Sequence, residues 1–212
     1  MKTLLRIASP LVLTIVSLML AVVPAMADTL YSNGPYDGNT AAWGIGGAQA
    51  VTDSTNLNSS RSNVYEVDFV YWDASESDLL TTVDMSMGTT PFGTDIFSGT
   101  LTGATNTFLG TNQYGYNLYQ SQVTMVIHTT GSASAYVTLS NACTTSGCDT
   151  NPISWDENSG PSTAYDSTLG SIPSESFTVI GTSETTPEPS SLMLFGSGML
   201  GLAGVLRRRL TR

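Results

Sequence analysis

Apolar and polar side chains alternate in short stretches along the middle of this chain, which is the pattern of a half-buried β-strand. The clearest stretch runs from residue 64 to 72, where Tyr65, Val67, Phe69 and Tyr71 share one predicted face. No helical pattern of useful length lies between the two terminal segments. Further strands are predicted at 49–52, 82–88, 96–101, 107–109, 114–118, 123–128, 133–139, 153–155 and 177–180. Short strands separated by turn residues predict an all-β fold, an antiparallel β-sandwich. A jelly-roll-like topology is expected by analogy with carbohydrate-binding and cell-surface modules.

Positive charge is almost absent from this β-rich segment. The chain has seven lysines and arginines, and Arg61 is the single one between residues 7 and 206, whereas all 17 acidic residues lie in that interval. Nucleic-acid binding depends on clustered basic side chains, so it is excluded as a function. Anionic polysaccharides and anionic membrane surfaces would be repelled. Neutral polysaccharides, cations and basic partners remain compatible with the charge.

The N-terminal residues have the three parts of a secretory signal peptide. Lys2 and Arg6 form a basic n-region, and an apolar h-region follows over 11–23. The small residues Ala25 and Ala27 form a cleavage site of the Ala-x-Ala type. This pattern predicts a signal-peptide helix over residues 1–27 that signal peptidase cleaves after Ala27. The apolar run is short for a permanent membrane anchor, which needs about 20 residues.

A second apolar run covers residues 190–206 and is followed by Arg207, Arg208 and Arg209. As a helix it would be slightly shorter than a hydrocarbon core of about 30 Å, which predicts a single marginal membrane helix. Basic flanking residues stay on the cytoplasmic side of a membrane. Both ends therefore predict that residues 28–189 lie outside the inner membrane.

The triplet Pro187-Glu188-Pro189 directly precedes this run. The triplet, the glycine-containing apolar helix and the terminal arginines together resemble the PEP-CTERM sorting signal, over residues 187–212. The resemblance implies processing by an exosortase, a membrane-embedded cysteine protease, in a Gram-negative-type bacterium that makes exopolysaccharide or biofilm matrix. It also implies a precursor tethered to the inner membrane and a product at the cell surface or in the extracellular matrix. The expected organisation is a signal peptide at 1–27, a β-sandwich domain at 28–180, a linker at 181–186 and the sorting signal at 187–212.

Cys143 and Cys148 are the two cysteines of the chain. In an oxidising exterior they are expected to pair, because the residues between them suit a tight loop. Closing so small a loop stabilises a fold by roughly 2 kcal/mol in the chain-entropy model. The predicted role of the disulfide is structural.

The sequence offers little for catalysis. His128 is the single histidine and lies within a predicted strand, so a catalytic triad and a histidine-rich metal site are both disfavoured. The acidic residues include no pair marked for glycoside hydrolysis. No catalytic residue is assigned, and a secreted hydrolase is the less favoured alternative.

The best candidate for a binding edge is the segment Trp155, Asp156, Glu157 and Asn158. Trp155 would serve as an aromatic platform for a sugar, although core packing is the favoured role for a tryptophan there. Asp156 and Asn158 could bind calcium, or they could form an Asx-type turn, and the turn is favoured. Calcium is the one cofactor considered. Other aromatic residues available for sugar binding are Trp43, Trp72, Tyr114, Tyr116 and Tyr119.

These observations predict a non-enzymatic, exopolysaccharide-associated protein of the bacterial surface or matrix. The alternative is a carbohydrate-binding, lectin-like module, either with or without a dependence on calcium. Its ligand would be a neutral polysaccharide, because the exported segment is acidic. The partners expected for the precursor are signal peptidase, the exosortase and the inner membrane.

Overall fold

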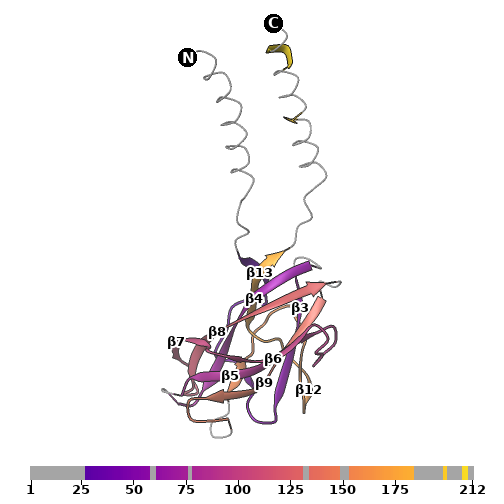
Figure 1. Ribbon diagram of the computed structural model, residues 1–212. Helices are drawn as coiled ribbons and strands as arrows, with labels where there is room; N and C mark the ends of the chain where they lie inside the picture. Colours follow the sequence, from indigo (N-terminus) through magenta and orange to yellow (C-terminus); the bar gives the residue numbers. More distant parts are fainter. Residues whose placement is uncertain are drawn as a thin grey trace, which may run out of the picture.

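The protein is described by a computed structural model, which covers residues 27–57, 61–75, 78–130, 134–148, 153–183, 198–199 and 207–209. These residues form thirteen strands in two sheets, and every pair of neighbouring strands is antiparallel. Figure 1 shows the strands gathered into one body. The prediction of an antiparallel, all-β domain is confirmed.

The first sheet is built around the long strand β4. One edge of β4 (Arg61–Asp73) pairs with β13 (Phe177–Ser183) and then with β10 (Ser154–Asp156), and the other edge pairs with β8 (Asn117–Thr130). The sheet is extended by β1 (Asp28–Ser32) beside β13, by β2 (Ala42–Gly44) beside β10, and by β7 (Thr105–Thr111) beside β8.

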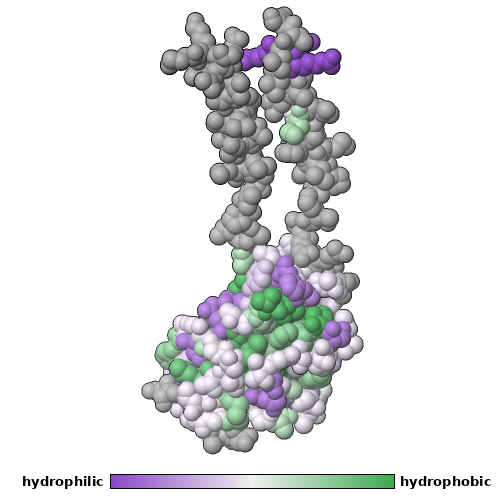
Figure 2. Space-filling model, in the orientation of Figure 1, coloured by the Kyte–Doolittle hydropathy of each residue, from purple (hydrophilic) through white to green (hydrophobic). Residues whose placement is uncertain are grey.

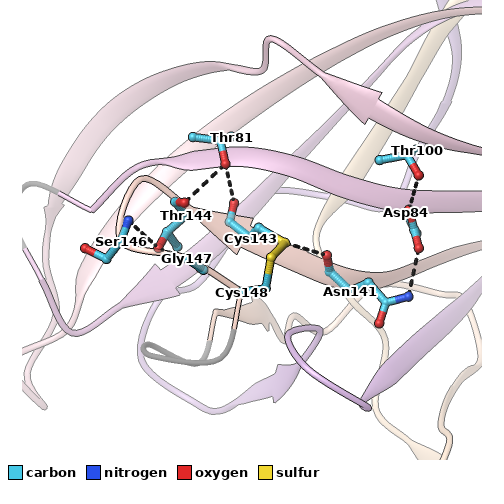
Figure 3. The surroundings of a disulfide bond; sticks show 9 residues. All are labelled: Thr81, Asp84, Thr100, Asn141, Cys143, Thr144, Ser146, Gly147 and Cys148. Atoms are coloured by element: carbon cyan, nitrogen blue, oxygen red, sulfur yellow. Dashed lines mark hydrogen bonds between the residues drawn. A yellow bond between two sulfur atoms is a disulfide. The ribbon is translucent and has the colours of Figure 1, made fainter.

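The second sheet has the order β12-β11-β3-β9-β5-β6. Its central strands are β3 (Ala50–Asn56), β9 (Ser134–Thr144) and β5 (Leu80–Gly88). At its edges lie β6 (Phe97–Thr102) and the short hairpin of β11 (Ala164–Asp166) and β12 (Gly170–Ile172). A disulfide joins Cys143, near the end of β9, to Cys148 in the turn that follows, which confirms the predicted pairing (Figure 3).

One hydrophobic core is shared by the two sheets. The first sheet contributes apolar side chains of β4, β8, β10 and β13, and the second contributes those of β3, β5 and β9. On β5 the alternating residues Val83, Met85 and Met87 are all buried, as the alternation predicts. The visible surface of the domain is mostly pale in hydropathy colouring, interrupted by green and purple areas (Figure 2). This is expected for a surface rich in serine, threonine and glycine.

The predicted face of the 64–72 segment is correct for Val67, Phe69 and Tyr71 but wrong for Tyr65. Val64 is buried, whereas Tyr65 has an exposed fraction of 37%. The pairing of β4 with β8 shifts register between Val64 and Glu66, which is a β-bulge. A bulge adds one residue to one strand, so the alternation of faces changes phase there.

Two further boundaries differ from the sequence-based expectation. The predicted strands 114–118 and 123–128 correspond to one strand, β8, which begins at Asn117, so Tyr114 and Tyr116 lie in a loop. Residues 181–183, predicted as linker, continue β13 and pair with β4. The short or irregular strands β1, β2, β11 and β12 were not predicted.

The predicted signal peptide over residues 1–27 lies outside the described residues except for Ala27, and so does the Pro187-Glu188-Pro189 triplet. Of the predicted membrane helix and its arginine flank, residues 198–199 and 207–209 are described, and they are helical. Among the described residues, no helix is long and apolar enough to cross a membrane.

Candidate functional site

Trp155, the aromatic residue of the predicted binding edge, is completely buried. Its ring makes edge contacts with Phe69 and Phe177, at centroid distances of 6.1 and 5.6 Å. Its indole Nε1 donates to the carbonyl oxygen of Ser176 at 2.9 Å. The side chain therefore packs in the core, and it offers no surface to a sugar.

Asp156 points to the opposite face of β10 and accepts three hydrogen bonds. Its Oδ1 accepts from Trp72 Nε1 at 2.6 Å and from the backbone N of Gly38 at 3.1 Å, and its Oδ2 accepts from the backbone N of Asp37 at 3.2 Å. Burial raises the pKa of Asp156 to about 6, although the Trp72 hydrogen bond opposes this shift. Asp156 thus connects β10 to the ring of Trp72 and to the loop that follows β1.

Glu157 and Asn158 also fix loops. Glu157 Oε2 accepts from Trp43 Nε1 at 3.0 Å. Asn158 Nδ2 donates to the carbonyl oxygens of Asn33 and Pro35, at 2.8 and 3.3 Å. Asn158 Oδ1 accepts from the backbone N of Gly160 at 3.0 Å, which is the favoured Asx-type turn.

Calcium binding by Asp156 and Asn158 stays a prediction, and their geometry gives it no support. The oxygens of both side chains accept hydrogen bonds from the protein. Within the part of the chain that the structure describes, no group of three or more His, Cys, Asp or Glu side chains could hold a metal ion.

The ring of Trp72, held by Asp156, supports two tyrosines that face solvent. The ring of Tyr114 stacks on that of Trp72, with a centroid distance of 6.0 Å and an interplanar angle of 28°. The ring of Tyr116 is tilted by 37° to that of Trp72, at a centroid distance of 5.7 Å. The exposed fractions of Tyr114 and Tyr116 are 57% and 41%. We call the exposed Tyr36, Tyr114 and Tyr116, together with the buried Trp72 on which the last two pack, the aromatic surface.

The tyrosines stand on a rigid turn between β7 and β8. Asn112 Oδ1 accepts hydrogen bonds from the backbone N of Tyr114 and of Tyr116, both at 3.0 Å. The backbone N of Gly115 donates to the carbonyl oxygen of Asn112, and Gly115 has a φ of 85°, which favours glycine. The turn is therefore ordered before any ligand binds, which lowers the entropy cost of binding.

Tyr36 is brought beside this turn by the loop over residues 33–40. Gly38 has a φ of 65°, and a Cβ there would lie 2.6 Å from Leu118 Cδ1 and 3.6 Å from Tyr36 Cδ2. Gln113 Nε2 donates to the carbonyl oxygen of Asn39 at 3.2 Å, which joins the two loops. The close approach of Gly38 to Leu118 brings the loop that carries Tyr36 to the start of β8.

A shallow groove of about 130 Å³ lies next to Tyr36 on the outer face of the first sheet. The polar residues of its lining are Asp68, Gln120, Ser176 and Thr178. Gln120 Nε2 donates to Asp68 Oδ2 at 3.2 Å. The groove and the aromatic surface together offer stacking faces beside hydrogen-bonding groups, which is the combination that sugars require.

Two further carboxyl groups lie inside the domain. Asp53 Oδ2 accepts from Ser162 Oγ at 2.8 Å and from the backbone N of Glu175 at 2.7 Å. Burial raises the pKa of Asp53 to about 6 and raises that of Glu175 well above its usual value, with a further contribution from Asp53. The two carboxylate oxygens of Glu175 have no hydrogen-bond partner among the residues that the structure describes.

Sequence reasoning identified Asp156 and the tyrosines as candidates but assigned them different roles. It grouped Asp156 with Trp155 in one binding edge, although neighbouring residues of a strand face opposite sides. It did not identify Tyr36, whose available signal was its position in the turn-forming segment Gly34-Pro35-Tyr36-Asp37-Gly38. His128, predicted to be structural, is exposed on β8 and contacts Asn63 Oδ1.

Comparison with known proteins concerns the C-terminal segment. A model of the PEP-CTERM protein-sorting motif matches residues 185–209, which include the Pro187-Glu188-Pro189 triplet and the apolar run. No curated protein matches the chain. The motif implies an exported, membrane-anchored precursor that an exosortase processes and sorts to the cell surface. The chain therefore carries the PEP-CTERM sorting motif that its C-terminal residues predicted.

Proposed function

We propose that this exported protein is a non-enzymatic component of the surface or extracellular matrix of a Gram-negative-type bacterium, where it binds neutral exopolysaccharide through the aromatic surface. The observation that carries the proposal is the pair of exposed tyrosines, Tyr114 and Tyr116, which are stacked on Trp72 and fixed by Asn112. The sorting motif supplies the location in which such a surface would meet polysaccharide.

The chemistry of the site favours a neutral sugar chain. The apolar faces of sugar rings pack on aromatic rings, and their hydroxyl groups pair with carboxylates and amides such as Asp68 and Gln120. Between the terminal segments the chain has one arginine and 17 acidic residues. The net charge of this part of the protein is therefore strongly negative, and it would repel an anionic polysaccharide.

A secreted hydrolase remains the less favoured alternative. It would need two carboxyl groups, one of raised pKa, facing a substrate across an open groove. Asp53 and Glu175 have raised pKa values, but both are fully buried and neither lines the groove beside Tyr36.

The experiment is a binding assay with the exported protein purified from its host. Soluble β-glucan, dextran and galactomannan are the neutral probes, and alginate is the anionic control. We expect binding to at least one neutral polymer and none to alginate, with equal affinity in calcium and in chelator. If none of the neutral polymers binds in either condition, the proposal fails.

A variant comparison locates the binding. The double variant Tyr114→Ala/Tyr116→Ala should weaken binding about tenfold or more, because exposed aromatic anchors contribute a large share of the energy at such surfaces. Tyr65→Ala is the matched control, since Tyr65 is a half-exposed tyrosine of the same sheet and lines neither the groove beside Tyr36 nor the groove on the second sheet. Equal losses in both variants would show that the aromatic surface is not the site.

A further inference from the structure

The outer face of the second sheet has a larger groove, of about 350 Å³, on the side of the domain opposite the aromatic surface. It runs across β5, β6 and β9. The other faces of β5 and β9 are buried in the shared core, and Phe97 and Leu101 of β6 are half-buried against it. Because the core lies between the two sheets, their outer faces point in opposite directions. Six of the residues that line the groove carry a hydroxyl group, namely Ser86, Thr94, Ser98, Thr100, Thr138 and Ser140.

One end of this groove is formed by Phe92, whose exposed fraction is 37%. The backbone N of Gly93 donates to the carbonyl oxygen of Thr90 at 2.9 Å, which places Pro91 and Phe92 at the two central positions of a turn. Phe92 has a φ of 59°, a conformation that favours glycine. A large apolar side chain thus occupies a position where local conformational preference would select glycine.

The loop around Phe92 is held tightly. Asp95 accepts hydrogen bonds from the backbone N and the hydroxyl of Thr89, both at 2.9 Å. A Cβ on Gly88 would lie 2.4 Å from the carbonyl carbon of Gly93, so the two ends of the loop are in close contact. The ring of Phe92 is therefore presented by a fixed loop.

Asp84 supplies the charged group of the groove. Its carboxylate accepts from Thr100 Oγ1 at 2.5 Å and from Asn141 Nδ2 at 2.8 Å, and these two bonds lower its pKa. Asn141 has a φ of 48°, so it and Phe92 are the two non-glycine residues of positive φ in the described chain. Unusual backbone conformations of this kind are concentrated at binding and active sites.

We propose that this groove is a second saccharide-binding site, so that the protein cross-links neutral polysaccharide chains from two opposite faces. In it, Phe92 packs against a sugar ring, while the hydroxyl groups and Asp84 pair with sugar hydroxyls. The inference rests on the proposed function for the ligand class, but its evidence is the groove and the Phe92 turn. A pocket of this volume lies within the usual range for a small ligand.

The test compares four forms of the full exported protein: the unchanged protein, Phe92→Gly, Tyr114→Ala/Tyr116→Ala, and the triple variant. Phe92→Gly removes the ring while keeping a residue suited to the turn, so the fold is retained. Tyr65→Ala is again the control, because its exposed fraction equals that of Phe92. Affinity for soluble β-glucan, dextran and galactomannan is measured, together with light scattering of each mixture.

The unchanged protein and Tyr65→Ala should raise light scattering by joining polymer chains. Phe92→Gly should still bind polymer, but the rise in light scattering should be about fivefold smaller. The tyrosine double variant should keep weak binding to polymer, and the triple variant should not bind. If Phe92→Gly scatters like the unchanged protein, or if the double variant already binds nothing, the second site is refuted while the proposed function stands. If the unchanged protein binds none of the polymers, both proposals fall.

Discussion

Asp156 has no access to solvent and accepts hydrogen bonds from three donors in two segments, the loop after β1 and the end of β4. Charge-assisted hydrogen bonds offset the cost of burying its carboxylate. The same bonds hold Trp72, and therefore the ring on which both tyrosines stack. Asp156 is a positioning residue behind the aromatic surface, in contact with no ligand.

Replacing Asp156 with asparagine tests this role. In asparagine an NH₂ group replaces one carboxylate oxygen, so it would face an N–H donor that now has an acceptor. Asp156→Asn should therefore lower the free energy of unfolding by about 1–3 kcal/mol. It should also weaken polysaccharide binding, since Trp72 loses its partner. Denaturant unfolding and a binding titration measure the two effects. Asp28→Asn, at an exposed carboxylate, is the control; a change there as large as at Asp156 would contradict the account.

The buried carboxyl groups predict a pH dependence of stability. The pKa values of Asp53 and Asp156 are raised to about 6, and burial raises that of Glu175 well above its usual value. An acid of raised folded-state pKa favours the folded state below its unfolded-state pKa, and this contribution is lost as pH rises through the folded-state pKa. The free energy of unfolding should therefore be higher at pH 5 than at pH 8, by about 2 kcal/mol or more.

Glu175→Gln tests the origin of that dependence. The amide resembles the protonated acid, so this variant should be more stable than the unchanged protein at pH 8 and show a shallower decline from pH 5 to 8. Thermal and denaturant unfolding across this range provide the measurement. A protein that gains stability toward pH 8 would disprove the assignment of the buried acids.

At the scale of elements, the loop over residues 33–40 depends on a glycine at position 38. At Gly38, φ is positive and a Cβ added by alanine would lie 2.6 Å from Leu118 Cδ1. At Gly47, φ is a similar 60°, but an added Cβ would have no neighbouring atom within 4 Å. Gly47→Ala should cost about 1 kcal/mol of conformational strain, and Gly38→Ala should cost more because a close contact is added. Equal costs in denaturant unfolding would mean that the packing of Tyr36 does not depend on Gly38.

Long strands could be predicted from the sequence, whereas β10 is the one three-residue strand that the predicted ranges include. The alternation over 82–88 and 133–139 extends through enough residues to define a face, and β5 and β9 follow it. β2, β11 and β12 have three residues each, too few for a period-two pattern. The bulge at Tyr65 reverses a face without any local signal, because it is set by pairing with β8 and β13.

The candidate site was harder to predict than the fold for a physical reason. Asp156, Trp72 and Gly38 are distant in the sequence, and their contact follows from the pairing of β10 with β4 and the path of the loop after β1. Sequence could identify Tyr114 and Tyr116 as aromatic candidates, but their placement in a loop depends on where β8 begins.

At the scale of the whole molecule, the terminal segments contribute most of the positive charge, and the rest is acidic. The exported protein recovered from its host should lack residues 1–27, and it should lack the arginine-rich C-terminus after exosortase processing. Mass spectrometry of the intact protein measures both ends. A product that still ends at Arg212 in cells with an active exosortase would contradict the sorting assignment.

The central claim is that the aromatic surface binds neutral polysaccharide. The most direct measurement is the affinity of the exported protein for exopolysaccharide isolated from its own host, compared with that of Tyr114→Ala/Tyr116→Ala. We predict saturable binding that the double variant weakens about tenfold or more, with Tyr65→Ala unchanged. Binding that is equally strong in all three proteins, or absent in the unchanged protein, would contradict the claim.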